Sequence, residues 1–126
     1  YARSGLDRAS VPALRQRLDA VMATDKPWLE NDLTLSQLAE RTGVSTHHLS
    51  QLLNEELGQT FFDFINARRV AEVQRCLADP AYAGQTVLEI ALASGFNSKG
   101  AFNSAFRQHA GLTPSEFRRQ AGQART

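Results

Sequence analysis

Apolar residues recur along the chain at the three- and four-residue spacing of α-helices, and the alternation typical of a half-buried strand is absent. Apolar residues mark seven such segments. Their apolar positions, in chain order, are Leu14, Leu18, Val21 and Met22; Leu35, Leu38 and Ala39; Leu49, Leu52, Leu53 and Leu57; Phe61, Phe64, Ile65, Val70, Val73 and Leu77; Ile90 and Ala91; Phe102 and Phe106; and Phe117. The pattern predicts an all-α protein of about seven helices.

Helix start and stop signals set the expected bounds of two segments. Ser10 is the predicted cap of the first helix, with Pro12 in its first turn. The longest helix is expected from about Phe61 to Ala78. Asp79-Pro80 should end it, because the residue before a proline disfavours the helical conformation.

Three other helix starts carry a capping box, in which a threonine stands three residues before Gln or Glu. They are Thr34–Gln37, Thr86–Glu89 and Thr113–Glu116. In this motif the hydroxyl accepts from the amide three residues on, and the Gln or Glu side chain accepts from the cap amide. Each cap contributes about 1 kcal/mol, so the boxes fix where these helices begin.

One sequence unit occurs twice. Thr34–Val44 matches Thr86–Phe96 at an offset of 52, and after the turn the match resumes at 53. The matched pairs are Thr34 and Thr86, Leu38 and Ile90, Ala39 and Ala91, Gly43 and Gly95, Leu49 and Phe102, Leu53 and Phe106, and Gly58 and Gly111. The second copy therefore carries one inserted residue near the start of its second helix.

The repeated unit has the features of a helix-turn-helix. Ala39 and Ala91 are small enough for two crossing helices to approach, and Gly43 and Gly95 can adopt the positive φ of a sharp turn. Gly43→Val is therefore expected to cost about 1–2 kcal/mol. A single copy could belong to any α-hairpin, whereas two copies in register favour a protein that reads duplex DNA. The alternative is a helical repeat used for protein contacts.

The predicted helix from about Phe61 to Ala78 joins the two copies. Its eighteen residues span roughly 27 Å at 1.5 Å per residue. A rod of that length can hold two recognition helices about one DNA turn, roughly 34 Å, apart. We therefore expect three parts: a lead-in over residues 1–32, the first helix-turn-helix with the joining helix over 33–79, and the second with a basic tail over 80–126.

Composition fits one folded domain, or two small subdomains. The 126 residues are 42% hydrophobic and 21% charged, which is ordinary for a soluble protein. The lone Cys76 cannot form an intramolecular disulfide and is interpreted as a small buried hydrophobe, so a cytoplasmic location is expected. The chain begins at Tyr1 without an initiator Met, which suggests a fragment of a longer protein.

Charge is distributed unevenly. The net charge is only +1, but residues 1–98 carry −3 and residues 99–126 carry +4. The basic side chains of the second part are Lys99, Arg107, Arg118, Arg119 and Arg125. A basic end on a near-neutral body is consistent with a nucleic-acid footprint and equally with a solvated tail.

No enzyme chemistry is indicated. The sequence holds no paired carboxylates, glycine-rich phosphate loop or triad spacing, and we expect neither enzymatic activity nor a cofactor. His47, His48 and the distant His109 do not form a convincing metal site. Trp28 is interpreted as a core residue that packs against the N-terminal helix.

Three stretches resemble the AraC/XylS family of transcriptional regulators: Leu35–Gly58, Phe64–Leu77 with Arg69, and Gly95–Arg118, whose G-x-T-P-x-x-[FY]-R ending is the most specific part. The resemblance implies seven helices in two helix-turn-helix subdomains joined by a long helix. It also implies activation or repression at bacterial promoters, contact with RNA polymerase, and an N-terminal sensor or dimerisation domain outside this sequence. Ser45–Gln51 is closest to a subgroup whose sensors are sometimes membrane-embedded.

The resemblance also implies which residues meet DNA. The base-reading positions fall on His47, Ser50 and Gln51 in the first unit and on Lys99, Gly100, Asn103 and Ser104 in the second, with Arg107 near the backbone. Gln51 and Asn103 can each bond bidentately to adenine, and Lys99 can reach guanine or phosphate. Thr34, Thr86 and Ser98 suit phosphates at helix N-termini.

Two departures from the family pattern affect this assignment. The first recognition helix, expected over Ser45–Glu56, holds no Lys or Arg and two glutamates, and Gly100 and Ala101 present almost no side chain. Shape readout and phosphate contacts are then expected to carry more of the binding. The competing function is a helical protein-interaction module with weak or lost DNA binding.

Overall fold

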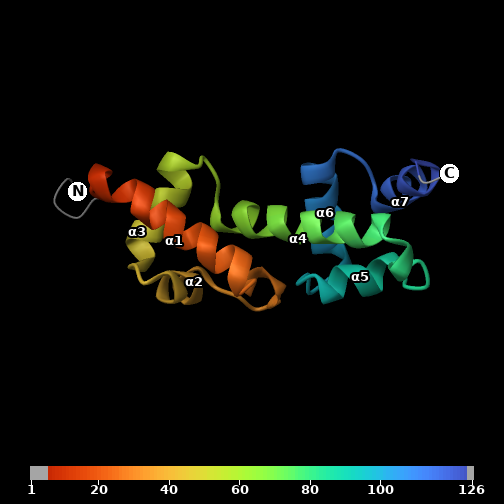
Figure 1. Ribbon diagram of the computed structural model, residues 1–126, viewed down its shortest axis with the longest axis horizontal. Helices are drawn as coiled ribbons and strands as arrows, with labels where there is room; N and C mark the ends of the chain where they lie inside the picture. The colour runs from red at the N-terminus through yellow and green to blue at the C-terminus, as the bar shows by residue number, and fades with distance from the viewer. Residues whose placement is uncertain (1–5, 125–126) are drawn as a thin grey trace. The chain divides into compact units, whose positions relative to one another are not determined.

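The computed structural model describes residues 6–124, which are helical and contain no strand. Figure 1 shows the seven α-helices: α1 (Val11–Thr24), α2 (Leu35–Thr42), α3 (Thr46–Gln51), α4 (Phe61–Ala78), α5 (Val87–Ala93), α6 (Lys99–Ala110) and α7 (Pro114–Ala124). Short 3-10 turns form η1 (Arg8–Ser10), η2 (Pro27–Leu29) and η4 (Pro80–Tyr82), and η3 (Leu52–Glu56) is a π-helical turn. The predicted all-α fold is confirmed, and α4 has the predicted bounds.

The described chain forms two compact units. Unit 1 contains residues 6–27 and Asp32–Phe64, and unit 2 contains Trp28–Asn31 and residues 65–124. The short segment Trp28–Asn31 thus belongs to unit 2, although unit 1 residues precede and follow it. The three-part division expected from the sequence stays a prediction. None of the helices within residues 6–124 is both long and apolar enough to cross a membrane.

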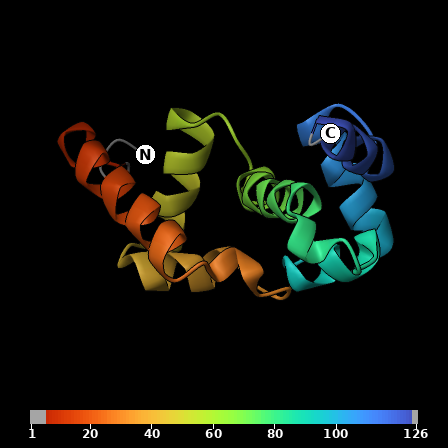
Figure 2. The same ribbon diagram turned by 45° about the vertical axis from the view of Figure 1, so that its right-hand side comes forward.

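The core of unit 1 lies between α1, α2 and the continuous turns of α3 and η3. Figure 2 shows α2 crossing the α3–η3 segment steeply. Most of the predicted apolar positions are buried: Leu14, Leu18 and Met22 from α1, Leu38 and Ala39 from α2, and Leu49, Leu52 and Leu53 from α3 and η3. Val21, Leu35 and Leu57 are only half-buried. Burial of this apolar stripe holds the short helices α2 and α3, which are too short to be stable in isolation.

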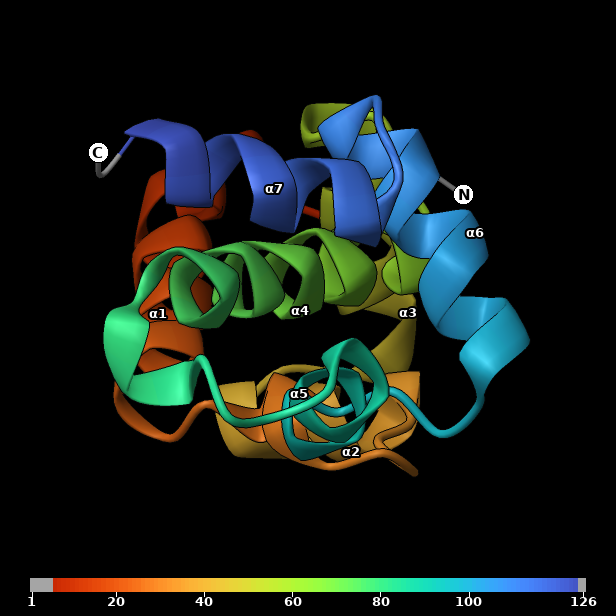
Figure 3. The same cartoon turned by 90° about the vertical axis from the view of Figure 1, so that its right-hand side faces the viewer.

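The core of unit 2 forms where α5, α6 and α7 meet α4, and Figure 3 looks nearly along α5 with α6 running across the view. Edge-on and tilted ring contacts connect Phe96 to Phe102 at 5.3 Å, Phe102 to Phe106 at 5.7 Å, and Phe106 to Phe117 at 5.8 Å between centroids. Cys76 is buried in the same core, as predicted. Burial raises the pKa of its thiol.

The three predicted capping boxes are present. The hydroxyls of Thr34, Thr86 and Thr113 each accept from the amide three residues on, and the Gln or Glu at that position accepts from the threonine amide. The predicted Ser10 cap is wrong. Ser10 is helical and its side chain makes no capping bond to α1, because Arg8–Ser10 already form η1, which the Asp7 side chain caps.

The sequence repeat extends to backbone hydrogen bonds. The Thr42 and Ser94 hydroxyls each donate to the carbonyl four residues earlier, at 2.8 Å. Gly43 and Gly95 have φ of +78° and +110°, so the predicted positive φ is confirmed in both turns. Each unit therefore contains one helix-turn-helix with the same internal bonding.

Candidate nucleic-acid interface

One face of α6 carries three of the predicted DNA-contacting residues. Lys99, Asn103 and Arg107 are spaced by four residues, which places them along one side of the helix. All three are exposed, as are Gly100 and Ser104 beside them. The structure thus brings the unit 2 candidates together on one solvent-facing surface.

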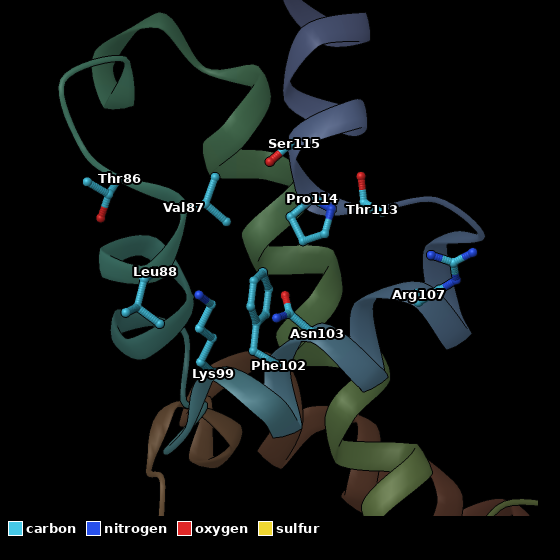
Figure 4. Close-up of a pocket in the computed structure, with 10 residues that line it drawn as sticks. All are labelled: Thr86, Val87, Leu88, Lys99, Phe102, Asn103, Arg107, Thr113, Pro114 and Ser115. Atoms are coloured by element: carbon cyan, nitrogen blue, oxygen red, sulfur yellow. The ribbon is translucent and has the colours of Figure 1, made fainter.

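This face borders a hollow of about 530 Å³ that lies within unit 2. Figure 4 shows Lys99 and Asn103 on α6 between the first residues of α5 and α7, with Arg107 at the edge. The lining residues are Thr86, Val87, Leu88, Lys99, Phe102, Asn103, Arg107, Thr113, Pro114 and Ser115. None of these ten residues is acidic. The hollow therefore combines two cations and the starts of two helices with an apolar floor, a combination suited to a polyanion with sugars and bases.

The three residues whose hydroxyls are predicted to contact phosphates each cap a helix. Thr34, Thr86 and Ser98 are exposed, and each hydroxyl oxygen accepts from a backbone amide of the helix it caps, at 3.1 Å. A hydroxyl that accepts in this way still has a proton to donate. The caps consequently hold these oxygens at helix starts, where an anion is favoured.

Two carboxylates, Glu89 and Glu116, stand at the starts of α5 and α7. The Thr86 amide donates to Glu89 and thereby holds the pKa of that carboxyl below its ordinary value. The Thr113 amide has the same effect on the pKa of Glu116, to which Arg119 and Arg107 contribute less. Both groups are thus anionic at neutral pH and offset part of the positive charge of this surface.

The unit 1 candidates lie on α3, and the side chains of two of them, unlike that of His47, are hydrogen-bonded to other described groups of the protein. His47 is exposed, whereas Ser50 accepts from the Asn54 side chain at 3.2 Å. The Gln51 side chain is half-buried, and its Oε1 accepts from the Leu6 amide at 2.9 Å. No sequence signal pointed to this last bond, because the donor is a backbone group 45 residues away.

Arg118 has a structural role within unit 2. Its guanidinium donates to the carbonyls of Tyr82 at 2.9 Å and Ala83 at 3.3 Å, and so fixes the turn that precedes α5. Three basic residues of the described C-terminal part are exposed: Lys99, Arg107 and Arg119. Arg125 lies outside the described residues.

Sequence reasoning missed two polar groups of the first unit. Ser45 caps α3 by accepting from the His48 amide at 3.1 Å. Asn54 is exposed and lies seven residues after His47, on the same α3–η3 segment. The helical spacing from His47 was the available signal for Asn54.

Known proteins resemble this chain in sequence and in fold. A family model described as a helix-turn-helix domain matches residues 38–120. The crystal structure of a Chromobacterium violaceum transcriptional regulator, described as an AraC-type DNA-binding domain-containing protein, superposes with a TM-score of 0.72. It shares 27% sequence identity, with 93% of this chain and 98% of that chain covered.

Two curated relatives also match. An uncharacterised helix-turn-helix-type transcriptional regulator of Staphylococcus aureus is 37% identical over 87 residues, which is 69% of this chain. The chain spans only 11% of the length of that relative. The probable transcription factor PqrA of Proteus vulgaris is 30% identical over 97 residues, covering 72% of this chain and 77% of that protein.

Proposed function

The chain belongs to the family of AraC-type helix-turn-helix domains, and we propose that it binds double-stranded DNA in order to regulate bacterial transcription. The α3–η3 segment of unit 1 and α6 of unit 2 are the two recognition helices, and each enters a major groove. Binding of this kind has no catalytic step and needs no cofactor.

The α6 face is the observation that carries this proposal. Lys99 and Arg107 supply charge for phosphates, and Asn103 between them has the amide that pairs with adenine. The adjoining hollow has an apolar floor and no acidic lining residue. Gly100 and Ser104 leave room for close approach of a base edge.

The two units divide the work. Unit 2 carries the cations and anchors the protein, whereas unit 1 lacks Lys and Arg on its recognition helix and discriminates between sequences through His47, Ser50 and Gln51. The eighteen residues of α4 form one uninterrupted helix of about 27 Å. A joining helix of that length favours binding to successive major-groove segments. Thr34, Thr86 and Ser98 contact phosphates.

Arg107→Ala should weaken binding nearly uniformly across DNA sequences. If Arg107 contacts only phosphate, its loss lowers the slope of log affinity against log salt by about one unit. The matched control is Arg118→Ala, which removes the same charge from the same unit but should leave that slope unchanged, because Arg118 bonds to backbone carbonyls. Fluorescence-anisotropy titrations over a salt series measure both. Equal slopes for wild type and Arg107→Ala would move Arg107 off the DNA surface.

Asn103→Ala should cost roughly 1–3 kcal/mol on the preferred site and much less on random DNA, as expected for a lost bidentate base contact. Gln51→Ala should weaken protection over the other half-site, about one helical turn away. Footprints of wild type and the two variants over one selected operator measure this. Equal weakening on specific and random DNA would contradict base reading. If each variant instead lost protection over the half-site assigned to the other unit, the assignment of the two units would be reversed.

A second function rests on α5. Leu88 and Leu92 are 40% and 48% exposed and lie four residues apart, so they form an apolar pair on the surface of this helix. An exposed apolar pair of this kind can contact a protein partner, and the partner proposed here is RNA polymerase. The chain covers only 11% of the Staphylococcus aureus relative. An additional N-terminal sensor or dimerisation domain in the full-length protein is consistent with that difference in length. A chain without salt-dependent DNA affinity would favour the protein-interaction role alone.

A further inference from the structure

The recognition helix of unit 1 carries no cation with which to approach DNA. Residues 46–56, which form α3 and η3, contain no Lys or Arg, and the last two of them are Glu55 and Glu56. Carboxylates at these positions oppose the approach of a phosphate backbone. A cation that docks unit 1 onto DNA must therefore come from another element of this unit.

Three arginines precede α1 or lie on it, and two of them are paired with carboxylates. Arg8 pairs with Glu56, and Arg15 pairs with Asp19, one turn later on α1, at 3.4 Å. Arg17 is exposed, and none of the carboxylates that the structure describes pairs with it. The Arg17 guanidinium is therefore able to bind an anion from outside the chain.

Arg17 borders a groove of about 670 Å³ within unit 1, hereafter the α1–α3 groove, which lies between α1 and the turn that leads into α3. Its lining includes Ser10, Leu14 and Arg17 on the α1 side, and Gly43, Ser45 and His48 on the other. The residues on the α1 side are spaced by four and three, so they share one face of the helix. Arg17 thus lies on the face of α1 that is turned toward the start of the recognition helix.

The start of α3 is the part of unit 1 that should lie closest to the bases. In a helix-turn-helix protein the first residues of the recognition helix contact base edges in the major groove. The phosphate backbones of the two strands border that groove on either side. A cation beside Ser45, the residue that caps α3, is consequently placed near a backbone rather than near the bases.

The α1–α3 groove offers hydrogen-bond donors beside the guanidinium. The Ser45 hydroxyl oxygen accepts from the His48 amide at 3.1 Å and still has its proton to donate. The Ser10 side chain is exposed and makes no capping bond to α1. A phosphate group accepts hydrogen bonds through its oxygens, so these donors match it.

One carboxylate, Asp7, also borders the α1–α3 groove. It lies before Ser10, and its side chain accepts from the Ala9 amide at 3.1 Å. Ser10 and Arg17 are about two helical turns, roughly 10 Å, apart along α1. Salt at about 0.1 M largely screens exposed charges over such a distance. The Arg17 end of the groove therefore stays favourable for an anion.

We propose that Arg17 of α1 contacts a DNA phosphate beside the major-groove segment that the unit 1 recognition helix enters, with the Ser45 hydroxyl as a second donor. This inference rests on the proposed function, since it requires unit 1 to bind DNA. It adds a helix outside the helix-turn-helix to the DNA interface. A phosphate contact positions the protein without reading sequence, so α1 docks unit 1 while α3 discriminates between bases.

Salt-series titrations of a duplex selected from a random library, followed by fluorescence anisotropy, test the inference with four proteins: wild type, Arg17→Ala, Arg17→Lys and Arg15→Ala. Arg15→Ala is the matched control, because it removes the same charge from the same helix. Arg15 lies two residues from Arg17, about 200° around the helix, and its guanidinium pairs with Asp19. Alanine and arginine both favour helix, and circular dichroism verifies that each variant is folded.

Arg17→Ala should lower the slope of log affinity against log salt by about 0.9, the value for one phosphate contact. Between 50 and 200 mM salt, wild type should then lose about three- to fourfold more affinity than Arg17→Ala does. The loss at low salt should be similar on the selected duplex and on random DNA. Arg17→Lys should keep nearly the wild-type slope, because the ammonium retains the charge. Arg15→Ala should also keep it.

Uncharged methylphosphonate linkages identify the phosphate. Placed one at a time through the unit 1 half-site of the selected duplex, they remove single negative charges from the backbone. At one linkage the substitution should weaken the binding of wild type and of Arg15→Ala, but should cause no further loss in Arg17→Ala. A pattern of losses that is the same in wild type and Arg17→Ala would overturn the inference.

The salt series separates the inference from the function on which it rests. Wild-type affinity that does not fall as salt rises would contradict DNA binding itself, and the inference would fall with it. A wild-type slope in Arg17→Ala, together with a lowered slope in Arg107→Ala, would overturn the inference alone and leave DNA binding by unit 2 in place. Equal lowering by Arg15→Ala and Arg17→Ala would also overturn it, because the effect would then come from overall charge.

Discussion

Gly95→Ala is expected to lower the free energy of unfolding of unit 2 by about 3–4 kcal/mol. A Cβ at this position would lie 2.2 Å from the Trp28 carbonyl oxygen and 2.7 Å from Arg69 Nε. Its φ of +110° adds strain, which costs roughly 1–2 kcal/mol for a residue with a side chain. The overlap adds about 1–3 kcal/mol, because the nearest atom is backbone and cannot move aside alone.

Gly43→Ala provides the matched control for this substitution. Gly43 is the equivalent turn residue of unit 1, but nothing lies within 4 Å of its added Cβ. Only the φ strain remains, so the loss should be about 1 kcal/mol. Urea unfolding followed by circular dichroism and by the fluorescence of Trp28 measures both variants. Equal losses for the two glycines would mean that the close approach of Trp28 to Gly95 carries no energetic weight.

The contrast between these glycines shows where the sequence was informative. The repeat predicted the same turn in both units, and the positive φ of each glycine confirms it. The capping boxes and the bounds of α4 were equally accessible, because their signals lie within a few residues of each other. The close contact at Gly95 could not be predicted from the sequence, because Trp28 lies far earlier in the chain and contributes only its backbone carbonyl.

The same distinction applies to the candidate site. The four-residue spacing on α6 could be predicted from the sequence, because helical geometry alone places Lys99, Asn103 and Arg107 on one face. The structural role of Arg118 could not, as its acceptors are carbonyls 35 and 36 residues away. Ser10 illustrates a local failure: its side chain suits a cap, but a 3-10 turn had already begun before it.

The π-helical turn η3 also lay beyond the sequence. The apolar positions Leu49, Leu52 and Leu53 fit an α-helix through this region, and all three are buried as expected. The backbone nevertheless widens, with the Leu57 amide donating to the Leu52 carbonyl five residues earlier. Widening of this kind is common at functional sites, and here the widened turn ends at Glu56, the carboxylate that pairs with Arg8.

Arg69→Met should destabilise unit 2 by about 2–4 kcal/mol. Arg69 is only 8% exposed, and its guanidinium donates to the Trp28 carbonyl at 2.7 Å and the Glu30 carbonyl at 2.8 Å. Methionine can fill the space of the side chain but leaves these carbonyls without their donor, at about 1–3 kcal/mol for a buried group. The guanidinium also lies 5.9 Å from the centroid of the Phe96 ring, an attraction that methionine lacks.

Arg75→Met on the same helix is the control for the loss of an arginine. Arg75 is exposed, bonds both carboxylate oxygens of Glu72 at 3.0 and 2.7 Å, and lies 5.8 Å from the centroid of the Tyr82 ring. Its substitution should cost some stability, but clearly less than that of Arg69, because Arg75 satisfies no buried carbonyl. Arg69→Lys should fall between wild type and Arg69→Met, because an ammonium keeps the charge but lacks the planar fork that spans two carbonyls. Equal stability of Arg69→Met and wild type would contradict the assigned role of these bonds.

Combining Gly95→Ala with Arg69→Met should cost less than the two separate losses together, by about 1–2 kcal/mol. Both substitutions act on one contact, since the methyl group that Gly95→Ala adds would displace the same Trp28 carbonyl that Arg69 holds. Once that carbonyl has moved, little of the Arg69 bond remains to be lost. Urea unfolding of the four proteins in this double-mutant cycle measures the coupling. Strict additivity would show that Gly95 and Arg69 stabilise unit 2 independently, and that the segment Trp28–Asn31 is held by other contacts.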